Sequence, residues 1–206
     1  MKKIFLAIAA MLFIVFVSCV HNDPYDGPGP VTVDPTTDYT KLTLNEISGT
    51  NKFVEIYNSG DVDIPLAGVK LQRNDGAAAG GSEWTGAATD SIPAGAYRIF
   101  LFNNYTPATL SDNPAYVGWT VGSGISGGQV LKVAIIDPSG KPVSTFIRGD
   151  VPLPAWQDTN VTATPSNSTY SRMDDGTWAY AAPTPGAANG PKTADITSPG
   201  YLTAQP

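Results

Sequence analysis

The sequence predicts an all-β protein folded as a β-sandwich, and three observations support this prediction. About eight short runs of aliphatic, β-branched and aromatic residues follow one another along the chain. The 21 glycines and 18 prolines divide these runs, as turn residues do between antiparallel strands. Helix-favouring runs are absent. Many short strands with frequent turns favour two sheets packed face to face.

The first four expected strands lie in the first half of the chain. Residues 42–47 and 53–57 form two β-type runs, and Asn58-Ser59-Gly60 ends the second. We expect a third strand at residues 66–71. Residues 97–102 are strongly apolar, which is typical of a strand buried on both faces, so we expect a central position for this run.

Two hairpins are expected in the second half of the chain. Asp137-Pro138-Ser139-Gly140 has the composition of a type I turn, and β-type runs flank it at residues 129–136 and 142–147. A second turn sequence, residues 173–176 (MDDG), lies in the same way between residues 168–172 and 177–180.

Two long connections, residues 73–93 and 103–128, interrupt this pattern. Trp84 lies in the first, Trp119 lies in the second, and Trp156 lies in another loop-like stretch. Aromatic side chains in loops are typical of carbohydrate or protein recognition. These three tryptophans are therefore candidate ligand-binding residues. The alternative is that they fold back over the ends of the sandwich.

The N-terminal segment has the pattern of a lipoprotein signal. Lys2 and Lys3 precede 14 apolar residues, and Ser18 stands before Cys19, the only cysteine. An apolar run of this length is shorter than the ~20 residues of a membrane span and suits a signal peptide. We therefore expect a signal peptide at residues 1–18 and a lipid on Cys19.

The remaining chain divides into three expected regions. Residues 19–40 are rich in Pro and Asp and predict a flexible N-terminal tether. Residues 41–189 form the β-sandwich domain. Residues 190–206 are polar and turn-rich, so we expect a C-terminal tail that is poorly ordered or lies on the surface.

Composition argues against several functions. The formal net charge of −6 is unfavourable for binding nucleic acid, whose partners are usually basic. The only histidine, His21, falls in the expected tether. The domain therefore lacks the imidazole of a Ser-His-Asp triad, a Cys-His pair or the usual zinc sites. We expect no enzyme activity, no catalytic residue, no metal and no cofactor.

The carboxylates have structural explanations that we favour over chemical ones. Glu46 and Glu55 could supply the two acids of a glycosidase, but ion pairs with a lysine are the better interpretation. The candidate lysines are Lys41, Lys52 and Lys70. Two acidic pairs offer oxygen ligands for Ca²⁺, but neither has the spacing of a calcium loop, and turn chemistry explains both better. These pairs are Asp61 with Asp63 and Asp174 with Asp175.

Several segments resemble the lamin tail domain family. The opening segments are residues 44–47 (LNEI), 53–58 (FVEIYN), 66–71 (LAGVKL) and 92–95 (IPAG). The closing ones are Arg172, Asp175-Gly176, Trp178 and residues 183–189 (PTPGAAN). The resemblance implies an immunoglobulin-like sandwich, and bacterial members are often secreted or membrane-attached. The chain departs from the family in a Gly/Ala-rich insertion after Leu71.

These motif residues also have physical roles of their own. Asn45 and Asn58 lie at expected strand ends, where amide side chains can bond free backbone groups. Gly186 follows a proline and is expected to adopt a positive φ. Trp178 is expected to pack in the core or at its rim.

The expected cellular location leads to two functional hypotheses. Asp23 and Asp26 follow Cys19 and resemble the export signal of Bacteroidetes lipoproteins, which implies an outer-membrane, cell-surface location. The first hypothesis is a non-catalytic, lipid-anchored binding module that serves an outer-membrane protein assembly, such as a TonB-dependent nutrient-uptake complex. The second is a surface glycan-binding module that uses the loop tryptophans.

Overall fold

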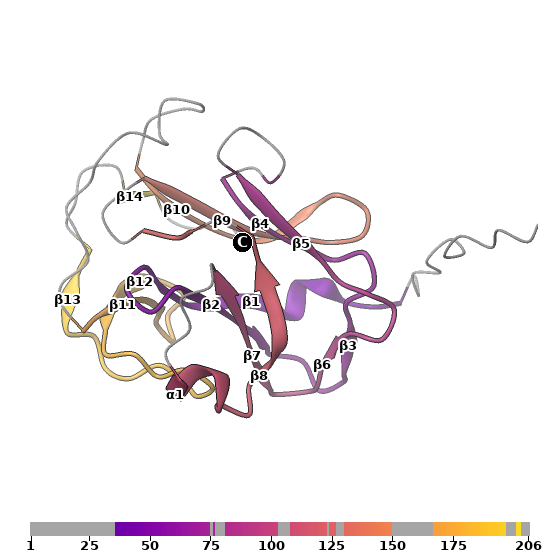
Figure 1. Ribbon diagram of the computed structural model, residues 1–206, viewed down its shortest axis with the longest axis horizontal. Helices are drawn as coiled ribbons and strands as arrows, with labels where there is room; N and C mark the ends of the chain where they lie inside the picture. The colour runs from indigo at the N-terminus through magenta and orange to yellow at the C-terminus, as the bar shows by residue number, and fades with distance from the viewer. Residues whose placement is uncertain are drawn as a thin grey trace, which may run out of the picture. The chain divides into compact units, whose positions relative to one another are not determined.

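The computed structural model describes residues 36–74, 76, 81–102, 108–122, 124–126, 130–149, 167–196 and 201–202. These residues form an all-β sandwich, as the sequence predicts. Two larger sheets face each other, and a small two-stranded ribbon lies beside them (Figure 1). The expected signal peptide, Cys19, His21 and most of the expected tether lie outside the described residues.

The larger sheet has seven strands, and all its neighbouring strands are antiparallel except β7 and β8, which run parallel. In spatial order the strands are β13 (Ala194–Asp195), β12 (Trp178–Ala181), β11 (Thr169–Arg172), β1 (Leu42–Ser48), β2 (Phe53–Asn58), β7 (Tyr97–Phe102) and β8 (Tyr116–Val121).

The second sheet has five antiparallel strands. Its order is β14 (Tyr201–Leu202), β10 (Pro142–Arg148), β9 (Leu131–Ile136), β4 (Lys70–Arg73) and β5 (Ser82–Thr85). Strands β3 (Ile64–Pro65) and β6 (Ser91–Ile92) form the small ribbon. The helical elements in the described part are one 3-10 turn, η1 (Tyr39–Lys41), and the short helix α1 (Ala108–Ser111).

The main core lies between the two large sheets. Alternate residues of each strand point into it, because side chains in a strand alternate between its two faces. Phe146 of β10 contacts two aromatic rings of the opposite sheet, Tyr170 at 5.0 Å and Trp178 at 4.7 Å between centroids. The Leu44 backbone N–H also donates to Ser144 Oγ at 3.1 Å. Aromatic packing and a buried hydrogen bond thus connect the two sheets.

A second, smaller core covers the outer face of the seven-stranded sheet. Phe53, Ile99 and Leu101 point outward from β2 and β7 and are fully buried. Leu110 of α1 and Ala115 cover them. Because both of their faces are buried, β2 and β7 carry long apolar runs, which explains the strong signal at residues 97–102.

The structure confirms both predicted hairpins. Gly140 N–H donates to Asp137 O at 2.9 Å in the first turn, and Gly176 N–H donates to Met173 O at 2.8 Å in the second. The third expected strand begins later than predicted, because β4 starts at Lys70. Leu66 and Val69 before it belong to a turn closed by the Val69 N–H to Leu66 O bond.

The expectation of two long connections without strands is wrong, whereas the C-terminal segment follows one of its two expected alternatives, because residues 191–195 are exposed on the surface. The predicted connections contain regular structure: β5 and β6 lie in the first, and α1 and β8 lie in the second. After Gly190, β13 pairs with β12, and β14 pairs with β10. The C-terminal segment therefore contributes an edge strand to each large sheet. Within the described ranges, no helix is long and apolar enough to cross a membrane.

Candidate functional site

The carboxyl groups of two glutamates on neighbouring strands lie side by side, and a loop near the C-terminus covers them. Glu46 of β1 is the cross-strand partner of Glu55 of β2. An irregularity in β1 between Leu44 and Glu46 makes this pairing possible, because it shifts the register by one residue. Both side chains are fully buried, with 0% exposure.

The loop of residues 183–189 covers these acids. Thr184 donates its backbone N–H to Glu46 Oε2 at 3.1 Å, and Gly186 donates its N–H to Glu55 Oε2. The other Glu55 oxygen accepts from Asn45 Nδ2 at 2.7 Å. Gly186 adopts the expected positive φ, +84°, which lets its N–H approach the carboxyl.

Asn189 closes this arrangement. Its side-chain amide donates to Asn45 O at 2.9 Å and to Arg172 O at 2.8 Å, so it ties the loop to β1 and β11. On the other side, Asn113 Nδ2 donates to Pro185 O at 2.8 Å. We call the loop of residues 183–189, together with Asn45, Glu46 and Glu55, the C-terminal clasp.

Burial changes the acidity of both carboxyls. It raises the pKa of Glu55 to about 8; bonds from Gly186 and Asn45 oppose this rise, and the Glu46 carboxyl adds to it. Burial also raises the pKa of Glu46, against hydrogen bonds from Thr169 and Thr184. Glu55 therefore keeps its proton at neutral pH.

The prediction that Glu46 and Glu55 form ion pairs with a lysine is wrong. Lys52 donates to Ile125 O at 2.6 Å, and Lys70 pairs with Glu83 at 2.9 Å. The acids bond instead to a loop more than 120 residues further along the chain. Because that loop covers both carboxyls, the pair holds the fold together in this structure, and a substrate does not reach it.

Two of the candidate tryptophans meet between the sheets. Trp84 lies on β5 and Trp119 lies on β8, with their ring centroids 5.1 Å apart. Phe100 of β7 contacts both rings, each at 4.9 Å. Their expected loop positions are wrong: both are half-buried strand residues that pack against the core. Trp156 lies outside the described residues.

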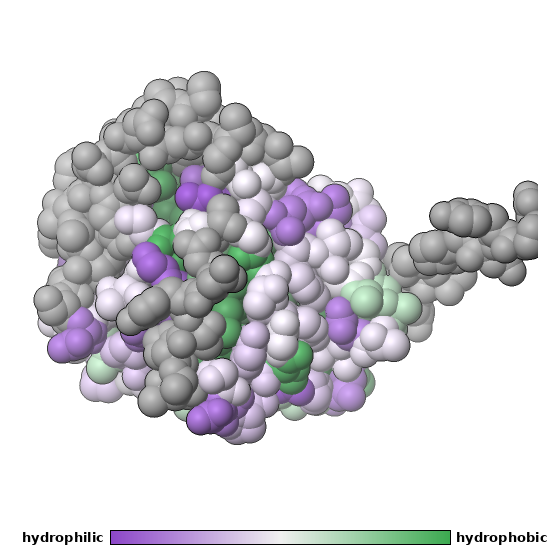
Figure 2. Space-filling model, in the orientation of Figure 1, coloured by the Kyte–Doolittle hydropathy of each residue, from purple (hydrophilic) through white to green (hydrophobic). Residues whose placement is uncertain are grey.

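Strand β8 presents apolar surface beside this cluster. Val117 is 47% exposed, and Gly118 and Thr120 are also exposed. Apolar surface is visible on this face between the two sheets (Figure 2). No residue from Tyr116 to Val121 is charged, whereas β5 carries Glu83 and β13 carries Asp195. We call Trp84, Val117 and Trp119 the β8 surface.

Asp175 has the local turn role that the sequence predicts for the acidic pairs, whereas Asp63 bonds a residue 31 positions further along the chain. Asp175 accepts hydrogen bonds from Thr177 N and Oγ1 at 2.9 and 2.6 Å. Asp63 accepts from Ala94 N at 3.0 Å. Among the residues that the structure describes, no group of three or more His, Cys, Asp or Glu is placed to hold a metal ion.

Asn58 and Trp178 behave as expected, but the expectation for Asn45 is wrong: it lies inside β1 rather than at a strand end, and its amide donates to the Glu55 carboxyl rather than to a backbone group. Asn58 is fully buried and donates to three backbone carbonyls, those of Val62, Ile92 and Pro93. Trp178 is buried in the core. Sequence reasoning missed the bracing role of Asn189, although the motif at residues 183–189 was a visible signal for it.

The described residues define an all-β sandwich with a buried acid clasp at its C-terminal end and an apolar, aromatic surface at one sheet edge. No protein-family model matches the chain, and no curated protein matches it significantly.

Proposed function

We propose that this chain is a non-catalytic, lipid-anchored lipoprotein whose β-sandwich binds a protein partner at the outer membrane. The main observation in support of a protein partner is the β8 surface, where an uncharged edge strand exposes Val117 beside two half-buried tryptophans. Exposed apolar residues next to aromatic rings are typical of protein interfaces. The natural partner is an outer-membrane assembly of the TonB-dependent, nutrient-uptake type.

The anchor part of the proposal rests on the N-terminal pattern that ends at Cys19. A lipid chain contributes ~0.8 kcal/mol per buried methylene, and stable anchoring takes more than one chain. Anchoring would place the domain near its partners in the same membrane. A high effective concentration then lets a weak contact suffice.

The lamin-tail resemblance is compatible with the geometry. Its opening motifs contribute Asn45, Glu46 and Glu55, and its closing motif contributes Gly186 and Asn189. These residues meet in the C-terminal clasp. The opening and closing motifs lie far apart in the sequence, and in the fold they contact each other at one place. This supports the proposal of a lamin-tail-type module.

Affinity purification of the tagged full chain from detergent-solubilised membranes tests the proposal. We expect recovery of an outer-membrane protein, and we expect Val117→Asp to lower that recovery by at least about tenfold, because a buried charge opposes an apolar contact. Val62→Asp is the matched control, since Val62 is the most exposed valine described, at 65%, and lies outside the β8 surface. Recovery of a free monomer, or equal loss with both variants, would contradict the proposal.

The anchor has its own test. Cys19→Ser should move the chain from the membrane fraction to the soluble fraction, and mass spectrometry of the wild-type protein should find acyl chains on Cys19. An unmodified thiol at the mature N-terminus would contradict lipid anchoring without affecting the β8 surface.

The second candidate is glycan binding through Trp84 and Trp119, with Trp156 as a further candidate. The observation in its favour is that both described rings remain partly exposed while they contact each other. Affinity electrophoresis with neutral polysaccharides tests it. Retardation that disappears in Trp119→Ala but not in Val117→Asp would favour the glycan over the protein partner.

A further inference from the structure

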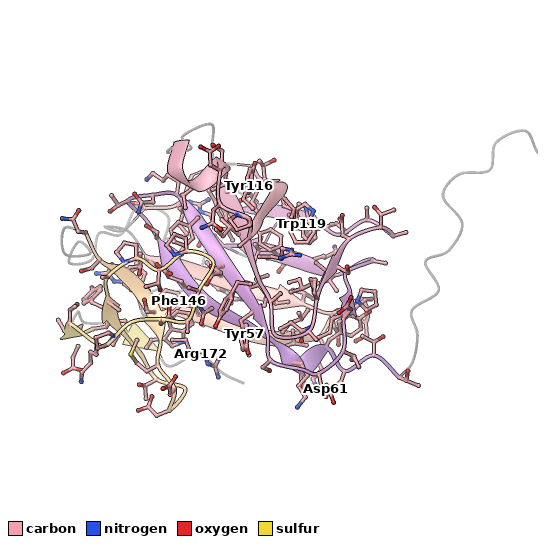
Figure 3. All side chains as sticks on the ribbon, turned by 90° about the horizontal axis from the view of Figure 1, so that it is seen from below. Tyr57, Asp61, Tyr116, Trp119, Phe146 and Arg172 are labelled. Carbon is pink, nitrogen blue, oxygen red and sulfur yellow. The ribbon has the colours of Figure 1, made fainter. Side chains whose placement is uncertain are left out.

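A hollow of about 380 Å³ lies where β1, β10 and β11 come together, away from the β8 surface. Its lining residues are Thr40, Thr43, Lys141, Pro142, Val143 and Arg172. We call it the Arg172 hollow. Figure 3 shows Arg172 well separated from Trp119. A ligand here would therefore not contact the β8 surface.

The charge of this hollow is opposite to that of the chain. Two cationic side chains, Arg172 and Lys141, line it, and no acid does, although the chain has a net charge of −6. The ion pairs in the described part of the chain are Lys70 with Glu83 and Lys192 with Asp195. Within those same residues, Arg172 and Lys141 therefore have no ion-pair partner.

Arg172 is held in place by its backbone. It is the last residue of β11, pairs with Trp178 of β12, and its carbonyl accepts from Asn189 Nδ2 at 2.8 Å. A fixed backbone with an unpaired guanidinium suits bidentate binding of a carboxylate. Lys141 lies close enough to Asp137 to help lower the pKa of that carboxyl, but Asp137 Oδ1 is bonded to Ser139 and to the Lys141 backbone.

The other walls offer two further kinds of contact. Pro142 and Val143 form an apolar wall. The hydroxyls of Thr40 and Thr43 can accept hydrogen bonds from a ligand, because they already donate to Asp38 and to Tyr57 O. Tyr57 is the cross-strand neighbour of Thr43, and its ring stacks on Tyr97 at 4.5 Å. Cations, hydroxyls and apolar surface therefore lie around one hollow.

We propose that the Arg172 hollow binds an acidic saccharide through the carboxylate of a uronate-type sugar. The two cations would bind the carboxylate, and the threonine hydroxyls would accept hydrogen bonds from the sugar hydroxyls. The apolar wall would contact the apolar face of the sugar ring. A peptide that adds as a strand is the weaker fit, because the part of β10 that lines the hollow begins with Pro142, which has no backbone N–H to donate.

Titration calorimetry of the full-length chain with oligogalacturonate tests this inference. We expect binding that weakens with added salt, and we expect Arg172→Gln to lower the affinity by at least about tenfold, as for loss of a charge-assisted pair. Methyl-esterified oligogalacturonate, which has the same sugar without the charge, should not bind. Lys192→Gln, which removes a cation outside the hollow, should leave the affinity unchanged.

A variant of opposite sign strengthens the test. Asp174 lines the neighbouring hollow of about 400 Å³, which also contacts Arg172. Asp174→Asn removes a negative charge near the guanidinium and should raise the affinity for oligogalacturonate. No binding, equal binding of the methyl ester, or equal binding of an acidic peptide would overturn the inference. The β8 surface is intact in all these variants, so such a failure would not count against the proposed protein partner.

Discussion

An irregular residue spacing in β1 places Glu46 opposite Glu55, and folding removes both carboxyls from water. Burying ionised carboxyls is costly, so such groups keep protons or gain strong donors. This pair does both: two backbone N–H groups of the clasp loop donate to it, and its pKa values rise. The clasp therefore links a local sequence feature to pH-dependent stability.

The stability of the fold should fall as pH rises from about 4.5 to about 8. The pKa of Glu55 is about 8 in the fold and 4.5 for an ordinary glutamate. The folded state therefore binds the proton more tightly. The stabilisation by this proton is complete below pH 4.5, the ordinary pKa of a glutamate, and it is lost as pH rises through about 8, the pKa of Glu55 in the folded state. The loss amounts to roughly a few kcal/mol of unfolding free energy. Urea unfolding at pH 5, 7 and 9 measures it.

Glu55→Gln identifies the group responsible, because an amide has the same shape and does not titrate. We expect the stability of this variant to change much less between pH 5 and pH 9. Glu83→Gln is the control: the pKa of Glu83 is lowered through its contacts with Gln72 and Lys70, so its contribution is lost at acidic pH instead. An unchanged slope in Glu55→Gln would assign the effect to other groups.

At the scale of elements, the sequence predicted what is encoded locally. The two hairpins form because turn residues and both strands lie within a few residues of one another. Strand β8 was missed because it pairs in parallel with β7 across an intervening helix. Strand β5 was missed because its mixed residues gain a partner only when β4 is already in place. Neither signal exists within the strand's own sequence.

The same reasoning explains the sites. The residue types of Trp84 and Trp119 made them candidates, but their contact depends on two sheet edges meeting. The acids Glu46 and Glu55 were also noticed, but their partners come from a distant loop. Sequence periodicity predicts which face of a strand is buried, and it does not predict which segment covers that face.

Two glycines that flank β10 allow the cost of backbone strain to be measured apart from the cost of side-chain crowding. Gly140 and Gly149 both have positive φ, +88° and +102°. A Cβ at Gly140 would meet no atom within 4 Å, whereas one at Gly149 would lie 2.6 Å from the Val130 side chain. We expect Gly140→Ala to cost about 1 kcal/mol of unfolding free energy and Gly149→Ala about 3 kcal/mol. Equal losses in urea unfolding would show that crowding has no effect.

For the domain as a whole, the C-terminal segment acts as a connector. The clasp loop covers the outer face of the seven-stranded sheet, β13 extends that sheet, and β14 extends the other one. A segment of fewer than thirty residues thus contacts both sheets. Because the main core already joins the sheets through Phe146 and its neighbours, this connector adds to a fold that has other support.

Two truncations separate the contributions of this connector. A chain that ends at Pro191 lacks β13 and β14 but keeps the clasp, and we expect it to fold with a loss of about 2 kcal/mol from the missing strand hydrogen bonds. A chain that ends at Ala182 also lacks the clasp. We expect it to lose roughly 3 kcal/mol more at pH 5, because the bonds of Asn189, Thr184 and Gly186 are gone.

The second truncation should also remove the pH dependence. Without the loop, water reaches Glu46 and Glu55, so their pKa values return towards 4.5 and the folded state no longer holds an extra proton at neutral pH. The stability difference between the two chains should therefore shrink as pH rises from 5 to 9, as measured by urea unfolding. A difference that stays constant over this range would mean that the loop is held by its backbone packing, with no part played by the buried acids.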